Sequence, residues 1–272
     1  MRLGMIGFGS IGGALADLLL PGEPLEHLAV LVRPGRAAEL RQRLDGEFAA
    51  VARDRSVVAD AEGMRAARPD LVVECAGHAA VAAHVPPLLA AGIPVVVASV
   101  GALADPGLEA ALRGAAAAGG TRLVLPAGAV GGVDLLAALG GTKGLEVRYR
   151  GTKPPGAWAG TPAADILDLA ALAAPAVFFT GSAREAARDY PKNANVAATL
   201  ALAGAGFEAT RVELVADPAA PGNVHEYSVA SPVASYAIRI ENRPSAGNAR
   251  TSAATVLSLL REIRNFRGPV AV

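Results

Sequence analysis

A single cysteine and balanced charge exclude several classes of protein for this 272-residue chain. Cys75 has no second cysteine to pair with, which excludes an intramolecular disulfide and a cysteine-cluster metal site and predicts a reducing, cytoplasmic location. Lys and Arg together number 25, as do Asp and Glu, so no global field attracts nucleic acid or an anionic membrane. The apolar runs end before the roughly 18 residues of a membrane span, and the sequence predicts no signal peptide. We therefore expect a cytoplasmic protein without nucleic-acid or membrane partners.

The sequence also lacks the motifs of several catalytic machineries. It contains no HExxH motif, no GxxxxGK[ST] phosphate loop and no Ser-His-Asp arrangement. His78 and His84 have no carboxylate or thiol at metal-ligand spacing, so we interpret both as structural and expect no metal. The composition is 52% hydrophobic and 18% charged, with 4% aromatic residues, which is typical of a soluble α/β enzyme with one large domain or two modest ones.

The N-terminus carries the most informative pattern, an apolar segment (residues 2–6), a glycine turn and then an amphipathic run. Gly7 permits a sharp turn, Gly9 leaves room for a pyrophosphate, and Gly12 lets a helix pack closely on a strand. The backbone N–H groups at the start of that helix favour phosphate. The order strand, turn, helix therefore predicts a dinucleotide site that includes Gly7, Gly9, Ser10, Ile11 and Gly12.

The residue that follows the second predicted strand (residues 27–32) bears on the choice of dinucleotide. An acidic residue there binds the adenosine ribose of NAD, whereas an arginine accommodates the 2′-phosphate of NADP. This chain has Arg33 at that point and Arg36 just beyond. We therefore expect NADP to be accepted alongside NAD.

Apolar strands and helical segments alternate as far as about residue 139. Buried strands are predicted at 69–75, 93–98 and 122–125, and helices at 79–91 and 105–119. Such alternation predicts an α/β fold with a Rossmann-type doubly wound parallel sheet, whose ligands bind at the C-terminal ends of the strands. The loop after Cys75, which begins at Ala76, should therefore face the cofactor.

The pattern changes to period-two alternation beyond that point. The segments 145–150, 210–215, 224–229 and 235–241 predict a half-solvated, mostly antiparallel sheet in a second, α+β domain. We expect a dinucleotide-binding domain at 1–139 and a substrate domain at 140–248. A helix at about 249–272 should return to the first domain, because its apolar face must be buried.

Candidate residues for the chemistry lie in this second domain. His225 suits proton transfer near neutral pH, and its neighbour Glu226 is a poor orienter because adjacent strand residues point to opposite faces. Ser182 has the capping-box spacing to Glu185 and is interpreted as a helix cap. Basic groups in or near loops could bind a carboxylated substrate: Lys153, Arg184, Lys192 and Arg243.

Several runs of residues together resemble the L-aspartate dehydrogenase family. They are Phe179-Thr-Gly-Ser182, Tyr190-Pro-Lys-Asn-Ala-Asn195-Val-Ala-Ala-Thr199, Asn223-Val-His225-Glu226 and Glu241-Asn-Arg-Pro-Ser, with Asn248-Ala-Arg-Thr-Ser252. With the N-terminal glycine motif and Ala127-Gly-Ala129-Val-Gly-Gly132, the likeness covers essentially the whole chain. The second run is far more specific than the glycine motif.

The resemblance implies an enzyme that interconverts L-aspartate and iminosuccinate with NAD or NADP, and oxaloacetate and ammonia after hydrolysis. It implies His225 as the active-site histidine, Ala129 and Asn195 as cofactor contacts, a homodimer, and a role in NAD biosynthesis. We assign the two substrate carboxylates to Lys192 and to Arg184 or Arg243. The alternatives are another two-domain dehydrogenase, similar to homoserine dehydrogenase or dihydrodipicolinate reductase, and a non-catalytic NADP(H) sensor.

Overall fold

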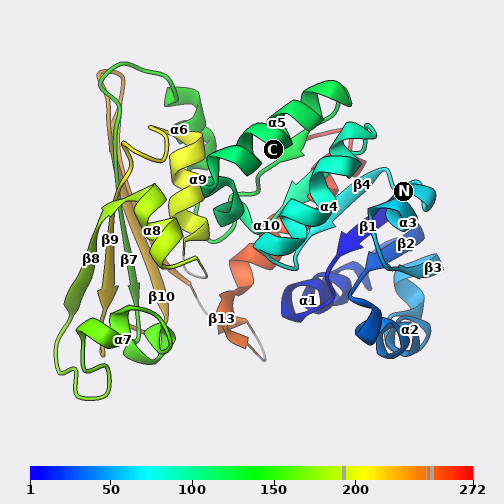
Figure 1. Ribbon diagram of the computed structural model, residues 1–272, viewed down its shortest axis with the longest axis horizontal. Coiled ribbons are helices and arrows are strands. Elements are labelled where there is room, and N and C mark those ends of the chain that lie inside the picture. The colour runs from blue at the N-terminus through cyan, green and yellow to red at the C-terminus, as the bar shows by residue number, and fades with distance from the viewer. Residues whose placement is uncertain (192–193, 243, 246–247, 272) are drawn as a thin grey trace. The chain divides into compact units, whose positions relative to one another are not determined.

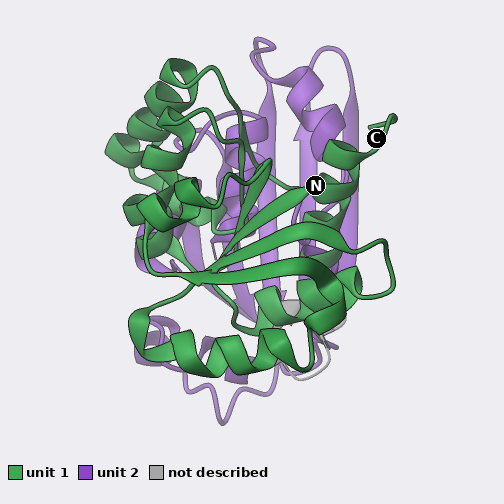
Figure 2. Ribbon diagram, turned by 90° about the vertical axis from the view of Figure 1, so that its right-hand side faces the viewer, with its two compact units in different colours: residues 1–126, 256–272 green, residues 127–255 purple. Residues whose placement is uncertain are grey.

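The chain divides into two compact units. The computed structural model describes residues 1–191, 194–242, 244–245 and 248–271. Unit 1 comprises residues 1–126 and 256–272, and unit 2 comprises residues 127–255 (Figure 2). The division falls ahead of the expected boundary at 139, because α6 (Val133–Leu139) packs on α9 (Asn195–Ala203) within unit 2. The loop and helix that follow the last strand of unit 1 therefore belong to unit 2.

Unit 1 contains a six-stranded sheet in which every pairing is parallel and the order is β3-β2-β1-β4-β5-β6. This order is that of a doubly wound Rossmann sheet, which confirms the predicted fold class. The strands are β1 (Arg2–Ile6), β2 (Leu25–Leu31), β3 (Ala52–Val58), β4 (Leu71–Glu74), β5 (Val95–Val97) and β6 (Leu123–Val124).

Helices connect these strands, as a parallel sheet requires. They are α1 (Ser10–Leu19), α2 (Ala37–Asp45), α3 (Ala61–Ala66), α4 (His78–Ala90) and α5 (Pro106–Ala118), with short 3₁₀ turns at Pro34–Arg36, Ala49–Val51 and Val100–Ala104. Two aspartates fix helix starts, since Asp60 accepts from the Gly63 amide and Asp105 from the Leu108 amide. The sequence prediction missed β3, an edge strand whose second to fourth residues are all charged.

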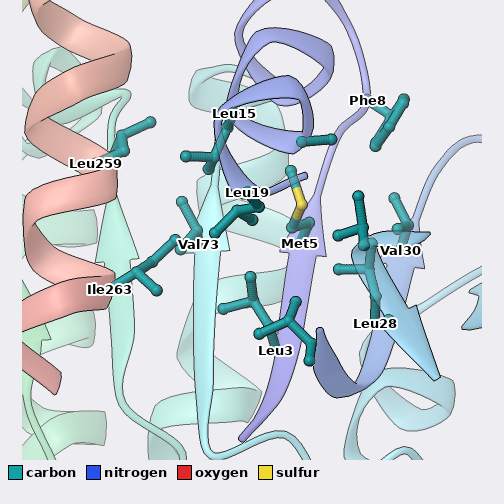
Figure 3. Close-up of a cluster of buried hydrophobic side chains, with 14 of the residues drawn as sticks. Leu3, Met5, Phe8, Leu15, Leu19, Leu28, Val30, Val73, Leu259 and Ile263 are labelled. Carbon is teal, nitrogen blue, oxygen red and sulfur yellow. The ribbon is translucent and has the colours of Figure 1, made fainter. Parts of the chain in front are cut away.

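The C-terminal helix α10 (Ala253–Arg267) contributes to the core of unit 1. Leu259 and Ile263 of α10 lie with Val73 of β4 and Leu15 of α1 in one buried cluster (Figure 3). The amphipathic face of this helix is therefore buried against the sheet and α1. Within the described residues, no helix is both long and apolar enough to cross a membrane.

Unit 2 contains a five-stranded sheet in the order β11-β10-β7-β9-β8. The β7–β9 pairing is parallel and the others are antiparallel, which confirms the mostly antiparallel prediction. Helices α6, α8 and α9 lie on one side of this sheet (Figure 1). The strands are β7 (Glu146–Lys153), β8 (Ala176–Ser182), β9 (Arg211–Ala216), β10 (Asn223–Ala230) and β11 (Ser235–Asn242).

The remaining elements of unit 2 are short. They are a 3₁₀ turn at Pro155–Trp158, α7 (Ala163–Ile166), α8 (Ala183–Asp189), and the paired strands β12 (Pro244–Ser245) and β13 (Asn248–Ser252). Ser182 begins α8 with both hydrogen bonds of a capping box to Glu185, so its predicted role as a cap is confirmed.

Leu259 tests whether α10 stabilises unit 1. Its side chain is fully buried, whereas Leu257 on the same helix is 53% exposed. We expect Leu259→Ala to lower the free energy of unfolding by about 2–5 kcal/mol, and Leu257→Ala to change it by about 0.5 kcal/mol or less. Urea unfolding of both variants measures the difference, and equal effects would contradict the packing described here.

Candidate active site

A cavity of about 650 Å³ opens at the C-terminal ends of β1, β2 and β4 in unit 1. Four of the predicted cofactor-binding residues line it: Gly7, Gly9, Arg33 and Ala76. Ser10, Ile11 and Gly12 form the first turn of α1 directly beyond. The structure therefore brings the residues of the glycine motif and the ends of two neighbouring strands to one place.

At each position of the motif, the geometry favours glycine for a different reason. Gly7 adopts φ +92°, in the left-handed region that side chains disfavour, and a Cβ there would lie 2.7 Å from the Ala76 Cβ. A Cβ on Gly12 would lie 2.6 Å from the Gly7 carbonyl oxygen, so only glycine lets α1 approach the turn this closely. A Cβ on Gly9 would meet no atom within 4 Å and would stand in the open space. A dinucleotide pyrophosphate fits this cradle at the start of α1.

Glu74, the last residue of β4, organises the edge of the cavity, and the sequence analysis missed it. Its fully buried carboxylate accepts hydrogen bonds from the backbone amides of Ala76 and Gly77, both at 2.7 Å. It also accepts from the Ser99 amide and hydroxyl, each at 3.0 Å. Glu74 thus ties the loop after β4 to the loop after β5. An acidic residue that ends an apolar strand was the available signal.

Three arginines also line the same cavity. Arg36 forms an ion pair with Glu39 at 2.9 Å, whereas Arg33 forms no ion pair with any residue that the structure describes. Arg43 also lines the cavity, where its guanidinium lies 5.4 Å from the ring centre of Phe8. Such a set of cations fits the 2′-phosphate of NADP.

The two histidines that we interpreted as structural also line this cavity. His78 is the first residue of α4, and His84 lies on the same helix. The position of His78, directly after the loop of a parallel strand, was the signal that the sequence analysis did not use.

His225 lies on β10 and is buried, with 5% of its surface exposed. Its Nδ1 lies 2.8 Å from the hydroxyl oxygen of Tyr149 on β7. Burial, and in second place the charge of Lys153, lower the pKa of His225 from 6.5 to about 3. The imidazole is therefore neutral near pH 7 and offers one donor and one acceptor nitrogen. Glu226 lies on the other face, where it pairs with Arg239 at 3.2 Å.

The loop that contains Ala129 packs on the same face of the unit 2 sheet as His225. The Asn242 side chain of β11 donates to the Ala129 carbonyl oxygen at 2.9 Å, and the Tyr227 hydroxyl donates to that of Gly131 at 2.6 Å. Asn195 is the first residue of α9, a helix that packs on β7. Ala129 and His225 are thus placed by two neighbouring strands, β10 and β11.

The basic residues assigned to the substrate carboxylates have different outcomes. Lys192 and Arg243 lie outside the described residues. Arg184 pairs with Glu208 and lies 4.9 Å from the ring centre of Phe207.

Lys153 lies on the same strand face as Tyr149, four residues along β7. Burial lowers the pKa of Lys153 from 10.5 to about 8. Its ammonium lies 5.2 Å from the ring centre of Trp158. Among the described residues, no group of three His, Cys, Asp or Glu side chains could hold a metal.

Both units match known protein families. Residues 134–266 match the family model of the aspartate dehydrogenase C-terminal domain, and residues 7–126 match that of the homoserine dehydrogenase NAD-binding domain. The chain is 47% identical to the L-aspartate dehydrogenase of Ruegeria pomeroyi, over 97% of this chain and 92% of that protein. It is 45% identical to that of Pseudomonas aeruginosa over the full length of both.

Solved structures of dehydrogenases also match this chain. The crystal structure of aspartate dehydrogenase from Thermotoga maritima matches with a TM-score of 0.74 and 28% identity, covering 100% of this chain and 99% of that one. A hyperthermophilic archaeal homoserine dehydrogenase has a TM-score of 0.55 and 12% identity, over 97% of this chain and 96% of that one, and shares the fold alone.

A doubly wound sheet with this glycine turn is the architecture of NAD(P)-dependent dehydrogenases, and we assign the chain to that class of enzyme. Identity of 45–47% that extends through both units exceeds what a shared fold explains. The chain belongs to the L-aspartate dehydrogenase family.

Glu74 tests whether the buried carboxylate holds the cofactor edge. Glu74→Ala leaves the amides of Ala76, Gly77 and Ser99 without their acceptor, so we expect a loss of about 3 kcal/mol in unfolding free energy and weaker NADPH binding. Urea unfolding and a fluorescence titration with NADPH measure the two effects. The control is Glu62→Ala, which removes an exposed ion pair with Arg65 and should cost about 0.5 kcal/mol or less. A Glu74 variant as stable as the control would refute this role.

The neutral state of His225 makes stability depend on pH in a defined window. Between pH 6.5 and 3 the unfolded chain binds a proton at His225 that the folded chain does not, so the unfolding free energy falls as the pH falls. From pH 7 to pH 5 this group accounts for a loss of about 2 kcal/mol. The His225→Asn variant lacks this titrating group, so it should not show this loss. Urea unfolding of both proteins at the two pH values measures the difference, and equal pH dependence would show that His225 is not held neutral.

Proposed function

We propose that this chain is an NAD(P)-dependent L-aspartate dehydrogenase. The enzyme oxidises L-aspartate to iminosuccinate, which hydrolyses to oxaloacetate and ammonia, and it catalyses the reverse reductive amination. The observation that carries the proposal is the 45–47% identity to proteins named L-aspartate dehydrogenase through both units. The shared fold with homoserine dehydrogenase does not favour that substrate, because its identity is 12%.

The proposed cofactor-binding residues are assigned in each unit by itself. In unit 1 the first turn of α1 binds the pyrophosphate, Ala76 flanks it, and Arg33 binds the 2′-phosphate of NADP. In unit 2 the Ala129 carbonyl and Asn195 contact the nicotinamide end. The fixed Ala129 loop supports this assignment, since Asn242 holds its carbonyl in place. When bound, the dinucleotide supplies the hydride chemistry.

The substrate site lies around His225. We assign His225 to the acid/base chemistry at C2, where water or ammonia is added and lost. The predicted carboxylate ligands Lys192, Arg184 and Arg243 remain proposals, and Lys153 joins them. Its support is a cation held on the His225 face of β7, where a carboxylate would relieve the desolvation of the ammonium.

The assembly and setting of the enzyme are further parts of the proposal. We propose a homodimer formed through the face of the unit 2 sheet that α6, α8 and α9 leave uncovered (Figure 1). That face carries exposed groups of both signs, including Arg148, Glu146 and Arg211, which can pair with a second copy. The free thiol of Cys75 suits the cytoplasm, and iminosuccinate is a product that NAD biosynthesis can use.

The experiment follows NADPH and NADH oxidation by the purified protein with oxaloacetate and ammonium. We expect oxidation that requires both substrates, and NADPH at least as effective as NADH if Arg33 binds the 2′-phosphate. His225→Ala should lower turnover by about 100-fold or more with unchanged cofactor affinity. The matched control is Glu226→Gln, the next residue on the opposite face, which should keep its turnover.

The other possible outcomes of this experiment indicate a different activity or mechanism. Oxidation with oxaloacetate alone indicates a 2-hydroxy-acid dehydrogenase. Cofactor binding without oxidation favours homoserine-type substrates, or a sensor if those also fail. A fully active His225→Ala variant removes His225 from the mechanism.

A further inference from the structure

Tyr149 reaches His225 diagonally across two strands. In the antiparallel pairing of β7 with β10, His225 lies directly opposite Gly151, and Tyr149 lies opposite Tyr227. Tyr149 and Gly151 are alternate residues of β7, so they belong to the same face of the sheet, which is also the face of His225. Gly151 has no side chain, so the β7 side chain that lies beside His225 is that of Tyr149, two residues away along the strand.

Gly151 leaves the space that this contact needs. A Cβ at Gly151 would lie 2.6 Å from the Tyr149 hydroxyl oxygen and 3.1 Å from the carbon that bears it. Gly151 is not among the glycines with positive φ, so its backbone conformation is open to any residue. The requirement for glycine here is thus one of space. The phenol ring lies across Gly151, and its hydroxyl oxygen comes to 2.8 Å from Nδ1 of His225.

The two groups meet in their neutral forms. Tyr149 is 3% exposed and His225 is 5% exposed. Burial raises the pKa of Tyr149 and lowers that of His225. Between a neutral phenol and a neutral imidazole, the phenol O–H is the stronger donor, so it donates to Nδ1. The proton of the imidazole then resides on Nε2, which makes no hydrogen bond to any other residue within the described part of the chain.

We propose that Tyr149 is a positioning residue for His225, that the absence of a side chain at Gly151 leaves the space for the Tyr149 ring, and that together they hold the imidazole with its proton on Nε2. This inference rests on the proposed function for its chemical role. As ammonia adds to the C2 carbonyl of oxaloacetate, the electron pair of the C=O bond moves to oxygen, and Nε2–H donates a hydrogen bond to that oxygen. No proton leaves the imidazole in this step, which resembles stabilisation in an oxyanion hole. The acid/base role proposed for His225 concerns the proton transfers that follow the addition.

The tautomer of His225 is tested in the cofactor-free protein by ¹⁵N-detected histidine NMR at pH 7, with the His225 signals assigned by their loss in His225→Asn. We expect a protonated Nε2 and an unprotonated Nδ1. In Tyr149→Phe the fixed tautomer should be lost in favour of a mixture. Tyr227→Phe is the matched control for this signal, because its hydroxyl bonds to Gly131 and not to His225. Protonated Nδ1, an imidazolium, or an unchanged tautomer in Tyr149→Phe would overturn the proposal.

A double-mutant cycle tests the role of Gly151 independently. We expect Tyr149→Phe and Gly151→Ala each to lower kcat about 10-fold, with the Michaelis constant for NADPH unchanged, since each breaks the same hydrogen bond. The double variant should lose about 10-fold and not 100-fold. Additive losses, or full activity of Tyr149→Phe, would contradict the proposal. If the wild-type protein shows no dehydrogenase activity, the proposed function fails, and the NMR result still decides the tautomer.

Discussion

A fully buried carboxylate fixes the edge on which the nucleotide site of unit 1 is built. Burying a charge is costly unless hydrogen bonds satisfy it, and Glu74 accepts four of them from Ala76, Gly77 and Ser99. These donors belong to the loops after β4 and β5, so one side chain holds two strand ends in register. Gly7 and Gly12 complete the frame by letting α1 close on β1. These contacts within the chain therefore frame the cavity.

In unit 2, by contrast, burial keeps two hydrogen-bonded side chains, His225 and Tyr149, neutral. Desolvation lowers the pKa of His225 and raises that of Tyr149, so their hydrogen bond joins two uncharged groups. A neutral imidazole acts through the orientation of its N–H group and not through charge. The Tyr149 ring, which lies across Gly151, sets that orientation. Lys153 is the cation of the same strand face, and burial moves its pKa to about 8, where a substrate carboxylate would stabilise the charge.

The sequence predicted those features that local spacing determines. The tight turn at Gly7, the close packing at Gly12 and the cap at Ser182 follow from patterns within one element. Strand β3 was missed because its charges hide an edge strand. The partner of His225 was missed because Tyr149 lies 76 residues away in the chain and meets it only through strand register. Glu74 had a local signal, an acidic residue at the end of an apolar strand, but the loop after β5, whose Ser99 also donates to it, lies 25 residues further along the chain.

Direct transfer of hydrogen from C2 of L-aspartate to the nicotinamide is the step on which the proposed function depends. The most direct measurement supplies L-aspartate deuterated at C2 together with NADP⁺ in ordinary water and analyses the reduced cofactor by mass spectrometry. We predict NADPH that carries one deuterium, because hydride passes directly between the two carbons. Unlabelled NADPH would show that the hydrogen comes from another source. The absence of any reduction with L-aspartate, while homoserine is oxidised, would contradict the account.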